Sequence, residues 1–439
     1  MKKKLILISI IWARPKDTCI PLGHMSLMAR MRQCDNVKII NLSYDVTDSQ
    51  LSIKNIVYEI QQKICKDQHC DVYIGFGAYI WNETIIRLIL KKLREVGYTG
   101  KIILGGPQVS YAPPGLELIY PECDFFIRGF AEDALYALMQ NSSNFKGIHE
   151  KNKKDCCEQS AVEIGRLPSP WLTEVIPISE NTFIRMETQR GCPFRCSYCQ
   201  HNGSPSSIKN PYLPLERISD EISLFTEKGV KDIVILDPVF NMGKNAISIL
   251  ELFKKKKYNG KLSLQCRFET LTSDFVKSCN GLDVTLEFGI QTTNQLENEA
   301  INRKFNIDNV TKAIQSLTLN KIDFEVSIIY GLPHQTVSSF MQTIQYCLNR
   351  QVPRVKAYPL LLLRGTALEK NRNTWALIEN EDLIPKVVQS NSFTKTEWQK
   401  MEQLARTLRL TENKHPKSVS TLEQIASHSS EGKKEDVLK

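Results

Sequence analysis

Three closely spaced cysteines are the residues of this chain best suited to chemistry. Cys192, Cys196 and Cys199 lie within residues 190–199, RGCPFRCSYC, with the spacing C-x-x-x-C-x-x-C. Thiolates are soft ligands that match the iron of iron–sulfur clusters. A loop this short can reach three corners of one cubane, and three ligands leave the fourth iron open to bind a substrate. The spacing therefore predicts a four-iron four-sulfur (4Fe-4S) cluster with these cysteines as its metal ligands.

Zinc is the main alternative occupant of such a loop. A structural zinc site uses four ligands, usually in two paired knuckles. The chain has no second C-x-x-C, although His201 could act as a fourth ligand. The adjacent Cys156 and Cys157 lack metal-site spacing, so we interpret them as incidental.

The composition favours a cytoplasmic protein that does not bind nucleic acid. Residues 1–13 combine lysines with an apolar run, as a signal peptide does, but RPKD at 14–17 ends this run without a cleavage site. Thirteen cysteines without such a signal favour reduced thiols. No stretch reaches transmembrane length. The net charge of +9 comes from scattered residues and short runs such as 254–257, which lack the signatures of nucleic-acid-binding folds.

The first 140 residues alternate apolar runs with amphipathic patterns of helical spacing. The expected strands are residues 3–11, 37–42, 72–77, 101–104 and 124–127, and the expected helices are residues 51–65, 85–96 and 132–139. Strands separated by helices need crossover connections, which favour parallel pairing. Residues 1–140 therefore predict a Rossmann-like, doubly wound parallel sheet, whose ligands bind beyond the carboxyl ends of its strands.

The rest of the chain predicts an α/β barrel followed by helices. Residues 141–180 are polar and irregular and are expected to form a linker. Six further strands, at 183–187, 232–236, 262–267, 284–289, 325–330 and 355–361, alternate with helical patterns. Residues 181–368 thus predict a partial (β/α)6 barrel with its working end at the carboxyl ends of the strands. We expect a helical segment over 369–411 and a disordered tail over 412–439.

The cysteine loop resembles the signature of the radical S-adenosylmethionine (SAM) superfamily, C-x-x-x-C-x-φ-C, in which φ is aromatic. Tyr198 fills the aromatic position. The resemblance extends from residue 187 to about residue 368. It implies that SAM binds the open iron of the cluster, and that one electron cleaves it to methionine and a 5′-deoxyadenosyl radical. It also implies an electron donor of the flavodoxin or ferredoxin type.

The same resemblance implies a SAM site at the strand ends. Residues 237–241 end the second barrel strand, where the family places contacts to the SAM amino group. Residues 265, 267 and 269 alternate and so share one face, and 287–292 resemble the E-x-G-x-Q segment. The implied SAM-binding residues are Tyr198, Asp237, Asn241, Gln265, Arg267, Glu269, Glu287, Gln291 and Gly331. A strand glutamate can also be a plain salt-bridge partner, and Gly-Leu-Pro at 331–333 a plain turn.

A Rossmann-like domain before this barrel resembles the layout of the cobalamin-dependent radical SAM class with a helical C-terminal domain. Residues 21–24, PLGH, 167–170, LPSP, and 360–366 fit that subgroup. The resemblance implies a cobalamin site lined by Gly75, Gly77, Gly105, Gly106 and Gly129, because glycine lets a ligand approach the backbone. The D-x-H-x-x-G motif of other cobalamin domains is absent at 67–72. The alternative is a Rossmann-like domain whose pocket is vestigial or holds another ligand.

This resemblance implies methylation of an unactivated carbon or phosphorus in a small molecule or natural product. One SAM would methylate the cobalamin, and a second would supply the radical. The first alternative is a cobalamin-associated rearrangement, cyclisation or oxidation without methyl transfer. The second is a non-catalytic iron–sulfur protein, which has no need of polar residues at a barrel mouth. RNA methylthiolation would need an N-terminal three-cysteine domain and an RNA-binding domain that the sequence does not show.

Overall fold

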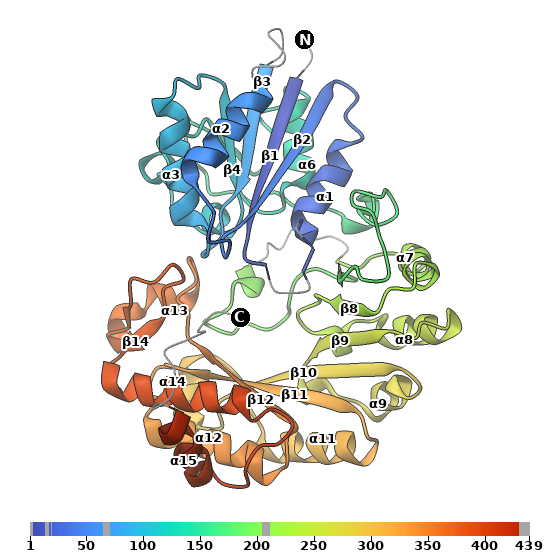
Figure 1. Ribbon diagram of the computed structural model, residues 1–439, viewed down its shortest axis with the longest axis vertical. Coiled ribbons are helices and arrows are strands. Elements are labelled where there is room, and N and C mark those ends of the chain that lie inside the picture. Colours follow the sequence, from blue (N-terminus) through green and yellow to red (C-terminus); the bar gives the residue numbers. More distant parts are fainter. Residues whose placement is uncertain (1–2, 14–16, 19, 65–70, 204–210, 430–439) are drawn as a thin grey trace. The chain divides into compact units, whose positions relative to one another are not determined.

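The computed structural model describes residues 3–13, 17–18, 20–64, 71–203 and 211–429 (Figure 1). The chain forms two compact units, Met1–Arg185 with Gly203–Leu224, and Met186–Asn202 with Phe225–Lys439. Residues 141–180, which we expected to be a linker, belong to the first unit. Trp171 is fully buried there, and the Ser169 hydroxyl donates to Glu221 over 2.6 Å.

The first unit contains a six-stranded sheet in the order β2-β1-β3-β4-β5-β6. The strands are β1 (Lys3–Ile11), β2 (Val37–Asp45), β3 (Asp71–Gly77), β4 (Lys101–Gly105), β5 (Phe125–Ile127) and β6 (Ile148–Glu150). The pairings among β1 to β5 are parallel, so the predicted doubly wound sheet is confirmed. The edge strand β6 is antiparallel to β5 and lies in the predicted linker, where no strand was expected.

Helices cover both faces of this sheet. They are α1 (Leu22–Met31), α2 (Ile53–Ile64), α3 (Glu83–Glu95), α4 (Pro107–Ser110), α5 (Leu116–Ile119) and α6 (Ala131–Met139). Side chains alternate along a strand, so Ile6 and Ile8 of β1 pack with α2 and α3, while Leu5 and Leu7 pack with α1 and α6. Every residue of β1 is buried. The signal-peptide-like start of the chain is thus a core strand, as predicted.

The second sheet has the order β12-β11-β10-β9-β8-β7. Its strands are β7 (Ile184–Met186), β8 (Asp232–Ile235), β9 (Lys261–Cys266), β10 (Asp283–Gln291), β11 (Asp323–Tyr330) and β12 (Arg354–Pro359). The helices that follow are α7 (Leu215–Glu227), α8 (Ala246–Lys255), α9 (Ser273–Cys279), α10 (Gln295–Ala300), α11 (Ile307–Leu319) and α12 (Val337–Asn349). The pairings from β8 to β12 are all parallel, so the predicted partial (β/α)6 barrel is confirmed (Figure 1).

The C-terminal region confirms one expectation and corrects another. The predicted helical segment contains α14 (Lys395–Leu410) and begins within α13 (Ala367–Lys370), and it also holds an antiparallel pair, β13 (Ile378–Glu379) and β14 (Val387–Gln389). The predicted disordered tail contains α15 (Val419–Ser429). Its apolar residues Val419, Leu422 and Ala426 have helical spacing and are buried, although the segment is rich in polar residues. Residues 430–439 lie outside the described part of the chain.

No helix in the described ranges combines the length and apolar character that crossing a membrane requires.

Candidate functional site

A pocket of about 250 Å³ lies in the second unit, beside the strand ends of the barrel. The cysteine loop and the short helix after it supply Cys192, Phe194, Cys196, Tyr198, Cys199 and His201. The barrel supplies Pro238, Val239, Gln265, Cys266, Arg267, Glu287, Phe288, Gly289, Gln291, Arg303 and Ser327. The structure therefore brings all three predicted metal ligands together with five of the nine predicted SAM-binding residues.

The three thiols share the pocket wall without meeting at one point. Within the residues that the structure describes, no three His, Cys, Asp or Glu side chains are close enough to hold a single metal ion. A cubane cluster binds its thiolates at separate corners, so this donor set suits a cluster better than a lone zinc ion. Burial raises the pKa of Cys199 to about 11, and it also raises the pKa of Cys192. At neutral pH both thiols are therefore protonated until a cation binds.

The end of α10 fixes the second half of the cysteine loop. The backbone N–H of Ser197 donates to the carbonyl of Ile301 over 2.9 Å, and its hydroxyl donates to the carbonyl of Ala300 over 3.0 Å. The Asn302 side-chain amide donates to the carbonyl of Arg195 over 2.7 Å. The last carbonyls of a helix lack partners within the helix. Here Ser197 supplies hydrogen-bond donors to two of these carbonyls and so ties the loop to the barrel.

Glu287, Gln265 and Gln291 all lie at the wall of this pocket. Glu287 of β10 is the register partner of Gln265 on β9. Gln291 adopts a left-handed backbone with φ of 69° at a β-bulge after Gly289. A side chain at Gly289 would collide with the Gln291 amide. The bulge redirects Gln291, and this local strain is typical of functional sites.

Asp237 and Asn241 do not reach the pocket wall. The buried Asp237 carboxylate accepts hydrogen bonds from the backbone N–H of Thr188 over 2.7 Å, from the Thr188 hydroxyl, and from the N–H of Gln189 over 3.1 Å. The Asn241 side chain bonds the N–H and the carbonyl of Arg267 over 3.0 and 2.9 Å. Both residues join neighbouring strand ends, so direct contact with SAM is not supported.

Asp237 provides a pH-dependent test of this structural role. Burial raises its pKa to about 7 from an ordinary 3.8, although three hydrogen bonds oppose the shift. Between these pH values the folded chain keeps a proton that the unfolded chain has lost. The Asp237 contribution to the free energy of unfolding therefore falls as pH rises through this window. Urea unfolding of Asp237→Asn should show a flatter pH dependence than the wild type.

Asp274→Asn is the matched control, because it makes the same substitution at an exposed position. Identical slopes for Asp237→Asn and the wild type would contradict the assignment.

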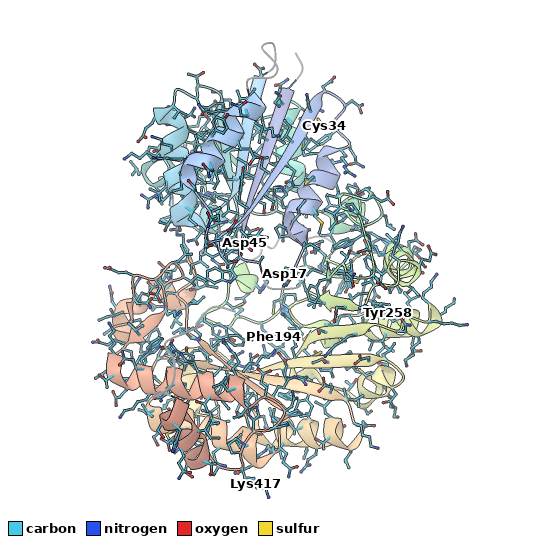
Figure 2. All side chains as sticks on the ribbon, viewed as in Figure 1. Asp17, Cys34, Asp45, Phe194, Tyr258 and Lys417 are labelled. Atoms are coloured by element: carbon cyan, nitrogen blue, oxygen red, sulfur yellow. The ribbon has the colours of Figure 1, made fainter. Side chains whose placement is uncertain are left out.

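Arg267 lies at the pocket wall, but neighbouring side chains engage its guanidinium. It makes two contacts of 3.2 Å with the Glu269 carboxylate, and its Cζ lies 3.6 Å from the centre of the Phe194 ring (labelled in Figure 2). Glu269 itself is not part of the pocket wall. Gly331 is not part of the pocket wall either. Its φ of 93°, and a backbone carbonyl oxygen 3.1 Å from where a Cβ would lie, explain why it is glycine.

Arg303 is the main site residue that the sequence did not indicate. Its side chain is buried at the pocket wall, donates to the Gly289 carbonyl, and lies 3.8 Å from Glu269. Its Nε has no hydrogen-bond partner among the described residues. It follows α10 in no recognisable motif, so no sequence signal could have singled it out. Phe194 was also missed, although it lies inside the cysteine motif.

Of the five glycines predicted to line a cobalamin site, Gly106 and Gly129 have clear structural reasons to be glycine. A Cβ at Gly106, where φ is 92°, would lie 2.6 Å from the Ala78 carbonyl oxygen. At Gly129, with φ of 83°, it would overlap the Ser160 backbone. At Gly75 and Gly77 it would lie 3.0 Å from a leucine and 3.2 Å from a tyrosine side chain, and at Gly105 it would make ordinary contacts. Access for a ligand is therefore not needed to explain why residues 106 and 129 are glycines.

An aromatic pair lies just after β3 of the same unit. The rings of Tyr79 and Trp81 are stacked, with centroids 4.6 Å apart and planes inclined by 14°. The indole N–H of Trp81 is buried without a hydrogen-bond partner in the described residues. On α1, the His24 ring bonds Asn41 over 2.7 Å, and burial lowers the pKa of His24 to about 4. Positions 67–69, where the sequence has D-Q-H, fall outside the described residues.

Comparison with known proteins agrees with this architecture. Residues 186–347 match the family model of the radical SAM superfamily. The cobalamin-dependent radical SAM methyltransferase TokK of Streptomyces tokunonensis is 25% identical over 301 residues, which cover 62% of this chain and 44% of TokK. The chain thus spans less than half the length of that relative.

Two solved structures share the fold across most of the chain. The radical SAM methyltransferase TsrM from Kitasatospora setae, with cobalamin and a [4Fe-4S] cluster bound, has a TM-score of 0.66 at 14% identity, covering 91% of this chain and 82% of TsrM. The cobalamin-dependent SAM radical enzyme OxsB, with aqua-cobalamin bound, has a TM-score of 0.66 at 13% identity, covering 98% and 71%. Identities this low establish a common fold and nothing about activity.

Proposed function

We infer that this chain, whose residues 186–347 match the family model of the radical SAM superfamily, cleaves SAM at a 4Fe-4S cluster held by Cys192, Cys196 and Cys199. The observation that carries this inference is the placement of all three thiols on the wall of one pocket, together with polar side chains from the barrel strands. When bound, the cluster supplies the electron for reductive cleavage of SAM. The chain supplies the ligands, the orientation of SAM and the exclusion of water.

We divide the predicted residues into those that contact SAM directly and those that hold the contacting residues in place. Glu287, Gln291 and Gln265 offer hydrogen-bonding groups to the hydroxyl and amino groups of SAM. Arg303 offers a positive charge and an unpaired N–H on the same wall as the thiols, which suits a carboxylate. The remaining predicted residues, Asp237, Asn241, Glu269 and Gly331, act through the side chains and loops that they hold.

We further propose that the first unit binds cobalamin. The stacked Tyr79 and Trp81 rings and the unpartnered Trp81 N–H suit a flat macrocycle that carries amide groups. They lie just after β3, and ligands of doubly wound sheets bind beyond the carboxyl ends of the strands. When bound, cobalamin supplies a carrier for a methyl group. His24 is neutral and engaged by Asn41, so this proposal gives it no role as a cobalt ligand.

The overall reaction that we propose is methyl transfer to a small molecule. Support comes from the name of a sequence relative, since TokK is a cobalamin-dependent radical SAM methyltransferase. A flavodoxin- or ferredoxin-type protein would deliver the electrons.

Cobalt content and product mass test this proposal together. The full chain, purified without oxygen from cells supplied with cobalamin, should contain iron, sulfide and stoichiometric cobalt. Each turnover on an accepted substrate should add the mass of one methylene unit. Cobalt with an unchanged product mass would favour rearrangement, and iron without cobalt would contradict the cobalamin proposal.

A further inference from the structure

The first half of the cysteine loop depends on side-chain contacts for its shape. Residues 190–197 form neither helix nor strand. Beyond Cys196 the loop is fixed by the backbone and hydroxyl bonds of Ser197 to the end of α10. The segment from Cys192 to Phe194 precedes these anchors, and Phe194 contacts the barrel through Arg267.

Arg267 is itself held by two neighbouring side chains. Its backbone N–H and carbonyl both bond the Asn241 side chain, and its guanidinium bonds the Glu269 carboxylate at two points. The Arg267 side chain is only 7% exposed. The guanidinium held in this way lies over the Phe194 ring, with Cζ 3.6 Å from the ring centre, which is within the range of a cation–π contact.

We propose that Arg267 is a positioning residue, which with Glu269 and Phe194 forms a clamp that holds Cys192 at the pocket. The role that we give the clamp rests on the proposed function, because it assumes a cluster at Cys192. The contacts that form the clamp do not depend on that function. It replaces the expectation that Arg267 contacts SAM directly. The three residues come from the cysteine loop, the end of β9 and the turn after it, so the clamp joins the loop to the barrel independently of α10.

Thiol alkylation in the cluster-free full chain tests the clamp. Cys192 precedes Phe194, whereas Cys199 follows the Ser197 anchor and serves as an internal control. Phe194→Leu or Arg267→Met should raise the alkylation rate of Cys192 by about tenfold and leave that of Cys199 within about twofold, as measured by mass spectrometry. Phe194→Tyr keeps the ring and should behave as wild type. Arg267→Lys keeps the charge but loses the planar stack and should be intermediate.

A double variant and SAM binding complete the test. If the two residues act through one contact, Phe194→Leu with Arg267→Met should react no faster at Cys192 than either single variant. Equal acceleration at Cys192 and Cys199, or wild-type rates in both single variants, would overturn the clamp. If Arg267→Met binds SAM more weakly but leaves the alkylation rate of Cys192 unchanged, Arg267 contacts SAM directly and the clamp is wrong. A wild-type chain that takes up no iron would refute the proposed function, while the alkylation rates would still decide on the clamp.

Discussion

Cys196→Ala protein is expected to lose SAM cleavage, with the rate of 5′-deoxyadenosine formation falling by more than about a thousandfold. Cys196 is the most buried of the three thiols, at 7% exposure, and lies at the pocket wall. Its removal leaves two ligands in a loop that needs three. Iron content and 5′-deoxyadenosine should be measured on the same anaerobic sample, with dithionite as the electron source.

Cys156 provides the matched control for this substitution. It is exposed and belongs to the first unit, whereas the pocket lies in the second. Cys156→Ala should keep wild-type iron and activity. Full activity in the Cys196 variant, or an equal loss of activity in both variants, would contradict a specific role of the cysteine loop in SAM cleavage.

Gly106→Ala is expected to destabilise the chain even when no cobalamin is present. The left-handed backbone at φ of 92° disfavours any side chain, and the new Cβ would lie 2.6 and 2.8 Å from the carbonyl oxygen and nitrogen of Ala78. Strain of both kinds should lower the free energy of unfolding by about 3 kcal/mol or more. Urea unfolding of cobalamin-free protein, followed by circular dichroism, measures this loss.

Gly97→Ala separates backbone strain from collision. Gly97 has a similar φ of 84°, but no atom lies within 4 Å of its Cβ position. This variant should lose only about 1 kcal/mol. If Gly106→Ala unfolds like the wild type yet fails to retain cobalt, Gly106 is needed to leave room for a ligand. The explanation from backbone strain and collision with Ala78 would then be wrong.

The sequence indicated the sheets well because buried parallel strands are continuous apolar runs. The run at 3–11 coincides with β1, Lys3–Ile11. Strands of two or three residues, such as β13 and β6, are too short to show an apolar run, and only their pairing with another strand defines them. For α15, polar composition outweighed the helical spacing of Val419, Leu422 and Ala426 in the prediction of a tail.

The site was predictable where chemistry fixes the spacing along the chain. Three cluster ligands must be close in sequence, so the cysteine loop could be found directly. A motif places Asp237 at a strand end but does not say which way its carboxylate turns, and the structure directs it to Thr188. Arg303 reaches the pocket because of the fold, through the anchoring of α10 to the cysteine loop.

The most direct test of the central claim is SAM turnover by the wild-type chain after anaerobic reconstitution with iron and sulfide. We predict a [4Fe-4S] spectrum and formation of 5′-deoxyadenosine and methionine that depends on a reductant. A well-folded chain that assembles no cluster, or that assembles one and leaves SAM intact under reduction, would contradict the account.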